Sequence, residues 1–124
     1  MRELTLVAIG GAAGSVARVL TTGLVYRFIS PAFPWGTFSV NVIGSMVFGV
    51  FVGVGAGRGA LSPDTRALLL PGLLGGFTTF SAFSFETVEL LTQGFAGRAL
   101  VNVIGQVTLG AAALWAGLRI GSAL

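Results

Sequence analysis

The sequence contains no cysteine and no histidine. Disulfides and thiol chemistry are therefore excluded, and so are zinc or acid–base sites that depend on imidazole. No nucleophile–base pair can be assembled from the remaining residues in a recognisable pattern. An enzyme is accordingly the least favoured class for this chain.

Charged residues are also scarce, at 9% of the 124 residues, whereas soluble domains carry roughly a quarter. Apolar residues make up 54% of the chain. A soluble domain of this length cannot bury so much apolar surface, so a lipid bilayer must be the solvent for most of it. All seven positive charges are arginines, and they are scattered. Without a basic stretch, we expect no nucleic-acid partner.

Four apolar segments are long enough to cross a bilayer, which takes about 20 residues. They cover roughly residues 4–28, 36–57, 67–91 and 98–121. Prolines, glycines and charges separate them. The first resembles a signal peptide, but its apolar run continues past Arg18, which favours a retained span. We therefore expect residues 1–124 to form one all-α integral membrane domain with four transmembrane helices.

The arginines give only a weak signal about orientation. The N-terminus, the 57–66 loop and the C-terminus share one side of the membrane and carry four arginines, against two on the other side. Such a weak bias is typical of a chain that inserts both ways and pairs as an antiparallel dimer. The alternative is a single orientation with the arginine-rich side in the cytoplasm, and charge counting by itself favours that alternative.

The first span contains closely spaced small residues and one charge. Gly10 and Gly14 have the four-residue spacing that lets membrane helices approach closely, either within one chain or between two. Arg18 has an apolar turn on either side. It can extend to the interface, hold an anion or hold a neighbouring backbone, and we assign it a structural role.

Two stripes of polar residues follow helical spacing. Thr37, Asn41 and Ser45 recur every four residues in the second span, and Asn102 and Gln106 do the same in the fourth. Asn41 can join helices by hydrogen bonds, or its amide can donate to an anion in a narrow pore. Two stripes on different spans predict a wet or ion-lined seam.

The third span contains the unusual segment GLLGGFTTFSAFSFE, residues 72–86. Gly75 and Gly76 lie near mid-membrane and predict a break in the helix near its centre. A break leaves carbonyls without helical partners, which lipid does not tolerate unless something else satisfies them. A cation held by carbonyl oxygens is one solution. Thr78 and Thr79 add hydroxyl oxygens, which hard cations prefer.

Phenylalanines follow the glycines directly. Phe77, Phe80 and Phe83 are three residues apart and are expected to share a helix face, with Ser81 and Ser84 beside them. Such rings can simply face lipid. Ring edges are electropositive, however, so rings turned edge-on to a pore would hold an anion lightly. Light binding is what conduction requires.

These motifs together resemble the CrcB/Fluc family of fluoride channels. The resemblance rests on GGAAGSVAR (10–18), GTFSVNVIGS (36–45) and above all GGFTTFSAFSFE (75–86), and it covers essentially the whole chain. It implies a passive, fluoride-selective channel in the bacterial inner membrane. Fluoride resistance is the implied role: hydrogen fluoride enters acidified cells, ionises, and leaves through the channel as fluoride.

The resemblance also implies an assembly and a site. Two identical chains form an antiparallel, dual-topology homodimer with two fluoride pathways along their interface. Carbonyls of Gly75 and Thr78 from both chains hold one structural sodium ion, Na+, on the two-fold axis. The predicted pathway residues are Phe80, Phe83, Asn41, Ser81, Ser84 and Gln106. The fourth span departs from the family, because Asn102, Gln106 and Gly110 stand where members often carry a tyrosine followed by serines.

Two other readings stay open. A proton-coupled small multidrug exporter also has four short spans, but it needs a carboxylate deep in its first span, where this chain has Arg18. Glu86 is the only substitute, and two alternatives are open for it: pairing with Arg18, or marking the water-facing end of its span. A non-transporting subunit of a larger membrane complex would explain the glycines but not the sequence GGFTTFS.

Overall fold

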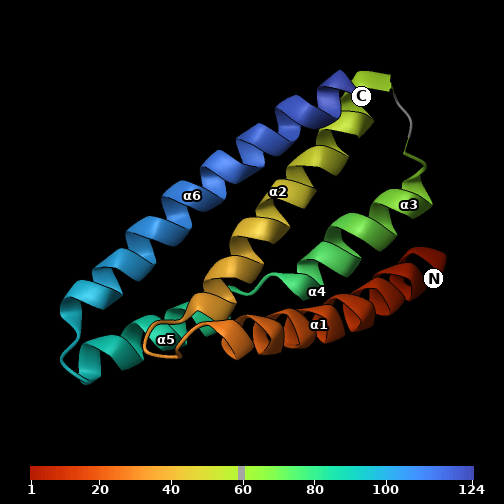
Figure 1. The fold of residues 1–124 in the computed structure, drawn as a ribbon. Helices are drawn as coiled ribbons and strands as arrows, with labels where there is room; N and C mark the ends of the chain where they lie inside the picture. The colour runs from red at the N-terminus through yellow and green to blue at the C-terminus, as the bar shows by residue number, and fades with distance from the viewer. Residues whose placement is uncertain (59–60) are drawn as a thin grey trace.

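The computed structural model describes residues 1–58 and 61–124, where helices are joined by short non-helical connections (Figure 1). Its elements are α1 (Arg2–Phe28), α2 (Trp35–Arg58), α3 (Pro63–Ala67), the π-helix η1 (Leu68–Leu74), α4 (Gly75–Phe77), α5 (Phe80–Thr92) and α6 (Ala96–Ala123). Four helical stretches are long and apolar enough to cross a membrane, which confirms the four predicted spans. Residues 59 and 60 of the predicted 57–66 loop lie outside the described residues.

The third span begins earlier than expected, at Pro63 instead of residue 67. The Ser62 hydroxyl accepts a hydrogen bond from the Thr65 N–H (3.2 Å), and proline at the first helical position needs no partner for its nitrogen. Pro71 lies inside the same span, within η1. Its missing N–H and its ring disturb the usual helical bonding, and the wider π-helical turn accommodates it.

Glycines allow the helices to touch backbone to backbone. α2 and α6 run side by side (Figure 1), and a Cβ on Gly49 of α2 or on Gly117 of α6 would overlap a carbonyl oxygen of the other helix. On α1, a Cβ on Gly10 or Gly14 would likewise overlap carbonyl oxygens of η1. The small residues of the first span therefore serve packing within one chain.

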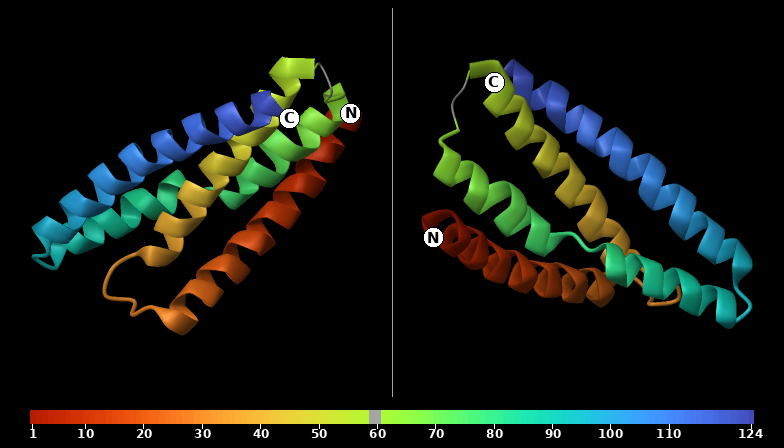
Figure 2. Two further views of the ribbon diagram at one scale, coloured as in Figure 1. Left: turned by 45° about the horizontal axis from the view of Figure 1, so that its top comes forward. Right: turned by 180° about the vertical axis from the view of Figure 1, so that it is seen from behind.

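The two ends of the bundle are distinct. The N-terminus, the start of α3 and the C-terminus lie at one end (Figure 2), where Arg2 and Asp64 form an ion pair (2.6 Å). At the other end, Arg98 donates to the carbonyl of Ala32 (3.0 Å) and lies over the Phe95 ring. The arrangement of termini and loops expected from the sequence is confirmed, and α5 lies in the half of the bundle near Arg98.

Candidate functional site

Two residues of the third helical stretch have extended backbone. α4 ends at Phe77, Thr78 (φ −77°, ψ 158°) and Thr79 (φ −150°, ψ 117°) follow, and α5 begins at Phe80. Gly75 and Gly76, the residues that pointed to a break near the centre of this span, both lie in α4, and the extended backbone begins three residues after Gly75, at Thr78. Gly76 has a packing role instead, since a Cβ there would overlap the carbonyl oxygen of Gly11 on α1.

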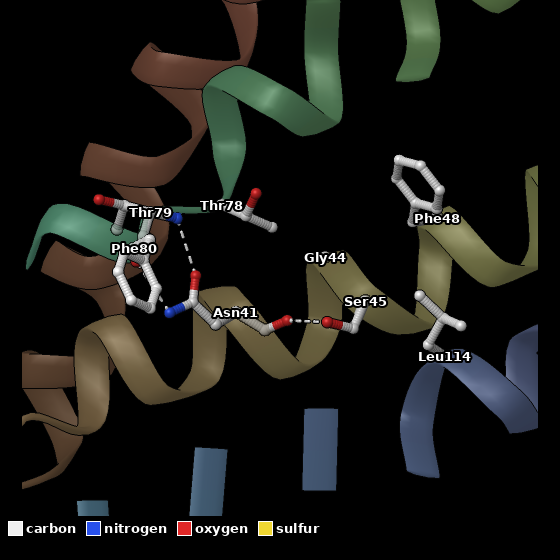
Figure 3. Close-up of a pocket in the computed structure, with 8 residues that line it drawn as sticks. All are labelled: Asn41, Gly44, Ser45, Phe48, Thr78, Thr79, Phe80 and Leu114. Carbon is white, nitrogen blue, oxygen red and sulfur yellow. Dashed lines mark hydrogen bonds between the residues drawn. The ribbon is translucent and has the colours of Figure 1, made fainter. Parts of the chain in front are cut away.

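The side chain of Asn41 on α2 pairs with the extended backbone (Figure 3). Its Oδ1 accepts from the Thr79 N–H (2.8 Å), and its Nδ2 donates to the Thr79 carbonyl (3.1 Å). The amide therefore bonds both polar groups of an extended residue, as a neighbouring strand would. Each of these groups would cost several kcal/mol if left unpaired in lipid, so Asn41 makes the extended conformation tolerable.

The extended residues release several carbonyls from helical hydrogen bonding, and those of Gly75 and Thr78 are two of them. In a continuous helix the Thr79 N–H would donate to the carbonyl of Gly75, and the Ala82 N–H to that of Thr78. Here the Thr79 N–H donates to Asn41, and the Ala82 N–H donates to the Thr79 hydroxyl (3.3 Å). Gly75 and Thr78 are the two residues predicted to hold a cation through their carbonyls, so the backbone suits that role.

Phe80 and Phe83 lie in the first turn of α5 with their ring centroids 5.6 Å apart. The Phe80 side chain is largely uncovered in the single chain, at 78% exposure, and Phe83 is half-buried. Phe77 lies in α4, before the extended residues, and so does not share the helix face of Phe80 and Phe83. The expectation that three rings share one face is therefore wrong. Ser81 is exposed and lies 3.3 Å, oxygen to oxygen, from the Thr79 hydroxyl, whereas Ser84 is half-buried.

A groove of about 320 Å³ runs past this segment. Figure 3 shows its lining, which combines polar groups near Asn41 with aromatic and aliphatic side chains farther along α2 and α6. The lining residues are Asn41, Gly44, Ser45, Phe48, Thr78, Thr79, Phe80 and Leu114. Two of the predicted pathway residues, Asn41 and Phe80, thus share one concave surface, while Gln106 is not among its lining residues.

The two polar stripes meet inside the bundle. Asn41 Nδ2 donates to Gln106 Oε1 (2.7 Å), and Gln106 Nε2 donates to Asn102 Oδ1 (2.8 Å). Asn102 is fully buried and Gln106 is 7% exposed. The two predicted stripes therefore meet, and their amides bond to one another. That water or ions line this seam stays a prediction.

Comparison with known proteins identifies the family of this chain. The family model described as "CrcB-like protein, Camphor Resistance (CrcB)" matches residues 5–118. The chain belongs to the CrcB family. Three similar relatives, each named a fluoride-specific ion channel FluC, come from Methylobacillus flagellatus, Rhizobium leguminosarum bv. trifolii and Opitutus terrae.

The similarity to these relatives spans nearly the full chain. The Methylobacillus protein is 45% identical over 97% of this chain and 94% of its own length. The Rhizobium protein is 45% identical over 100% and 99%, and the Opitutus protein 46% over 90% and 86%. All four spans of this CrcB chain therefore have counterparts in the relatives.

Glu86 and Arg18 lie near this site but do not pair. The Glu86 Oε1 accepts from the Thr37 hydroxyl (2.7 Å), while its Oε2 is buried with no hydrogen-bond partner among the described residues. Arg18 lines a cavity of about 270 Å³ together with Thr37 and Thr79. Among the residues that the structure describes, the ion pair present is that of Arg2 and Asp64, so of the two alternatives for Glu86 the pair with Arg18 is not formed.

Sequence reasoning missed Thr87 altogether, and it missed the partner of Thr37. The Thr87 hydroxyl accepts from Asn102 Nδ2 (3.0 Å) and donates to the Phe83 carbonyl (2.7 Å), and Thr37 binds Glu86. Thr37 lay in a recognised stripe, but its partner is 49 positions away. Thr87 carried no spacing signal, because its contact with Asn102 depends on how α5 packs against α6.

Proposed function

We propose that this CrcB chain is a passive, fluoride-selective channel that exports cytoplasmic fluoride across the bacterial inner membrane. The observation that carries the proposal is its membership of a family in which full-length relatives about 45% identical are named fluoride-specific channels. The local chemistry supports it, since aromatic rings, hydroxyls and an amide meet around Asn41 and Phe80, and the described lining residues of the groove include no arginine.

The anion path in this proposal follows the Phe80 and Phe83 rings. Ring edges carry partial positive charge and would hold fluoride without a fixed cation, whose binding would be too tight for rapid release. The Ser81 hydroxyl lies exposed beside Phe80 and supplies a donor, and Ser84 supplies another on the next turn. Asn41 borders the same groove, although both of its amide donors are engaged with Thr79 and Gln106.

The activity is tested with purified protein in liposomes loaded with fluoride or chloride. We expect fast fluoride efflux, measured with an ion-selective electrode, and negligible chloride efflux. No proton gradient should be required, which separates a channel from a proton-coupled exporter. Equal efflux of the two anions, or none of either, would refute the proposal.

We also propose that two antiparallel copies form the channel, and that the extended residues break the third span inside the membrane. Gly75 lies three residues before Thr78 and Phe80 directly follows Thr79, and both are exposed in the single chain. The adjacent groove is open in a single chain, and a second copy of this chain would cover it. The four-to-two arginine distribution is weak enough to permit insertion in both orientations.

Because the chain lacks cysteine, one engineered thiol reports its orientation. Leu61→Cys places that thiol in the 57–66 loop. An impermeant thiol reagent applied to intact cells should label about half of the molecules if insertion is dual. Labelling of all molecules or of none would mean one fixed orientation.

The released carbonyls of Gly75 and Thr78 suit a structural Na+ between the two copies. Carbonyl oxygens are the ligands that such a hard cation prefers, and the ion would neutralise their partial charges in a dry interface. Thr78 and Asn41 hold the backbone for this purpose: the Thr78 hydroxyl donates to the Leu74 carbonyl (2.9 Å), and Asn41 pairs with Thr79.

Sodium replacement by a bulky organic cation tests this site, with dimer stability measured alongside fluoride efflux. We expect both to fall when sodium is removed. Gly75→Val should be severe, because its side chain would crowd the axis, whereas Thr78→Ser should have little effect because the ligand is a backbone atom. Unchanged stability and efflux after exhaustive dialysis would exclude a cation at this position.

A further inference from the structure

A continuous chain of hydrogen bonds starts at Thr79, the residue that caps α5, and returns to α5 about two turns later. It begins at the Thr79 carbonyl and passes through Asn41, Gln106 and Asn102 to Thr87. The Thr87 hydroxyl closes it on the Phe83 carbonyl (2.7 Å). We call these four side chains, Asn41, Gln106, Asn102 and Thr87, the amide ladder. Its two ends bracket the turns of α5 that carry Phe80 and Phe83.

Each link of the amide ladder has a defined direction. Gln106 accepts from Asn41 with its oxygen and donates to Asn102 with its nitrogen, and Asn102 in turn donates to Thr87. A side-chain amide bonded at both its oxygen and its nitrogen cannot rotate without losing a bond. Gln106 therefore holds the nitrogen of Asn41 on the side where it also reaches the Thr79 carbonyl.

Burial argues against direct contact between an anion and either Gln106 or Asn102. Gln106 is 7% exposed, Asn102 is fully buried, and neither lines the groove beside Phe80. Exposed hydroxyls such as Ser81 are better placed to meet an ion. The Oε1 of Gln106 is moreover occupied by Asn41, at 2.7 Å.

We infer that Gln106 and Asn102 are positioning residues of the channel, which fix the Asn41 amide and thereby the extended backbone at Thr79 and the ring-bearing start of α5. The inference rests on the proposed fluoride conduction for its functional meaning. It assigns the two amides an indirect role, in place of the pathway role that the sequence suggested for Gln106. In low dielectric such a connected network is rigid when complete and costly when one member is missing.

The test combines amide hydrogen exchange with fluoride efflux, using the full-length protein in liposomes or detergent. Gln106→Leu removes the central link while preserving apolar volume. We expect the Thr79 amide to exchange about tenfold faster and fluoride efflux to fall about tenfold, the effect of losing one hydrogen bond of ordinary strength. Thr108→Val is the matched control, because Thr108 is exposed on the same helix and its hydroxyl donates to carbonyls one turn earlier in α6.

A second variant and a double variant make the outcome decisive. Asn102→Leu breaks the ladder one link farther away and should also raise exchange at Thr79, with Gln106 itself unchanged. In an Asn41→Ala background, Gln106→Leu should not raise the exchange rate further, since the two act through one bond. Reduced efflux with unchanged exchange at Thr79 would overturn the inference and place Gln106 in the pathway. Unchanged exchange and unchanged efflux would overturn it as well.

The two proposals fail separately. Wild-type liposomes that release no fluoride would refute the channel function, whatever the exchange rates show. Normal wild-type efflux combined with unaltered Thr79 protection in both ladder variants would refute the positioning role while leaving the channel function intact.

Discussion

The contact between α2 and α6 has two halves built on different chemistry. Toward the C-terminal ends, glycines of each helix lie against the backbone of the other: Gly49 and Gly53 on α2, and Gly117 and Gly121 on α6. Toward the opposite end of the bundle, the same two helices are joined by the hydrogen bond between Asn41 and Gln106. Glycines define how closely the helices approach, whereas the amides define how a third element, α5, is oriented against them.

The two halves should respond differently to substitution. Where the backbones of α2 and α6 touch at glycines, neither helix can move aside for a larger residue, so the glycine half acts as a rigid frame. The amide half carries directional bonds to the extended residue Thr79, whose backbone would otherwise be unsatisfied. Variants in the first half should affect folding, and variants in the second half should affect conduction.

The largest effect is expected for Gly117→Ala in the glycine half. The new Cβ would overlap the carbonyl oxygen of Met46, and backbone on both sides cannot move aside, so we expect a loss of about 3 kcal/mol or more. Thermal unfolding and the yield of monodisperse protein in detergent measure it. Gly23→Ala is the matched control: it meets nothing within 4 Å and should be neutral or slightly stabilising. Equal behaviour of the two variants would contradict the backbone contact.

Phe80→Ile and Phe83→Ile should each reduce fluoride efflux while the protein still folds. Isoleucine keeps apolar volume but lacks an electropositive ring edge, whose contact is worth about 1 kcal/mol, or roughly fivefold in rate. Liposome efflux and size-exclusion chromatography provide the two readouts. Phe28→Ile, an exposed ring at the end of α1, serves as the control and should conduct normally. If all three variants conduct alike, the α5 rings are only packing.

The smallest contrast is expected between two variants of one residue: Asn41→Asp should conduct less than Asn41→Ser. Aspartate would turn a carboxylate oxygen toward the Thr79 carbonyl and Gln106 Oε1, both of which now accept from Asn41. It would also repel an approaching anion, whereas serine retains one donor. Efflux rates of dimeric protein decide the order, and the reverse order would remove Asn41 from both roles.

Several features of this CrcB chain followed from its sequence. Apolar length predicted four spans, because crossing a bilayer requires about 20 apolar residues whatever their partners. The polar stripes were also recognisable, because residues four apart share a helix face, and Asn41 and Gln106 do meet. The start of the third span was missed by four residues, although Ser62 and Pro63 are an ordinary helix-start signal.

The position of the extended residues could not be read from composition. Glycine is the weakest helix former apart from proline, so Gly75 and Gly76 pointed to the break, yet both are helical and the extended pair is Thr78 and Thr79. What decides the matter is Asn41, which lies 38 positions earlier and supplies both hydrogen bonds to Thr79. Helix propensity describes what a residue itself costs in a helix. The hydrogen bonds that stabilise the extended backbone at Thr79 come instead from Asn41 on another helix.

The sequence by itself determined that this is a four-span membrane protein and that it carries the motifs of its family, because both depend on residue type and spacing along one chain. The tertiary structure decided which amides are buried, which carbonyls are released, and that Gly76 packs against Gly11 while Gln106 reaches Asn41. These outcomes depend on how closely the helices approach one another. Helix approach is set by contacts between distant residues, which no local pattern contains.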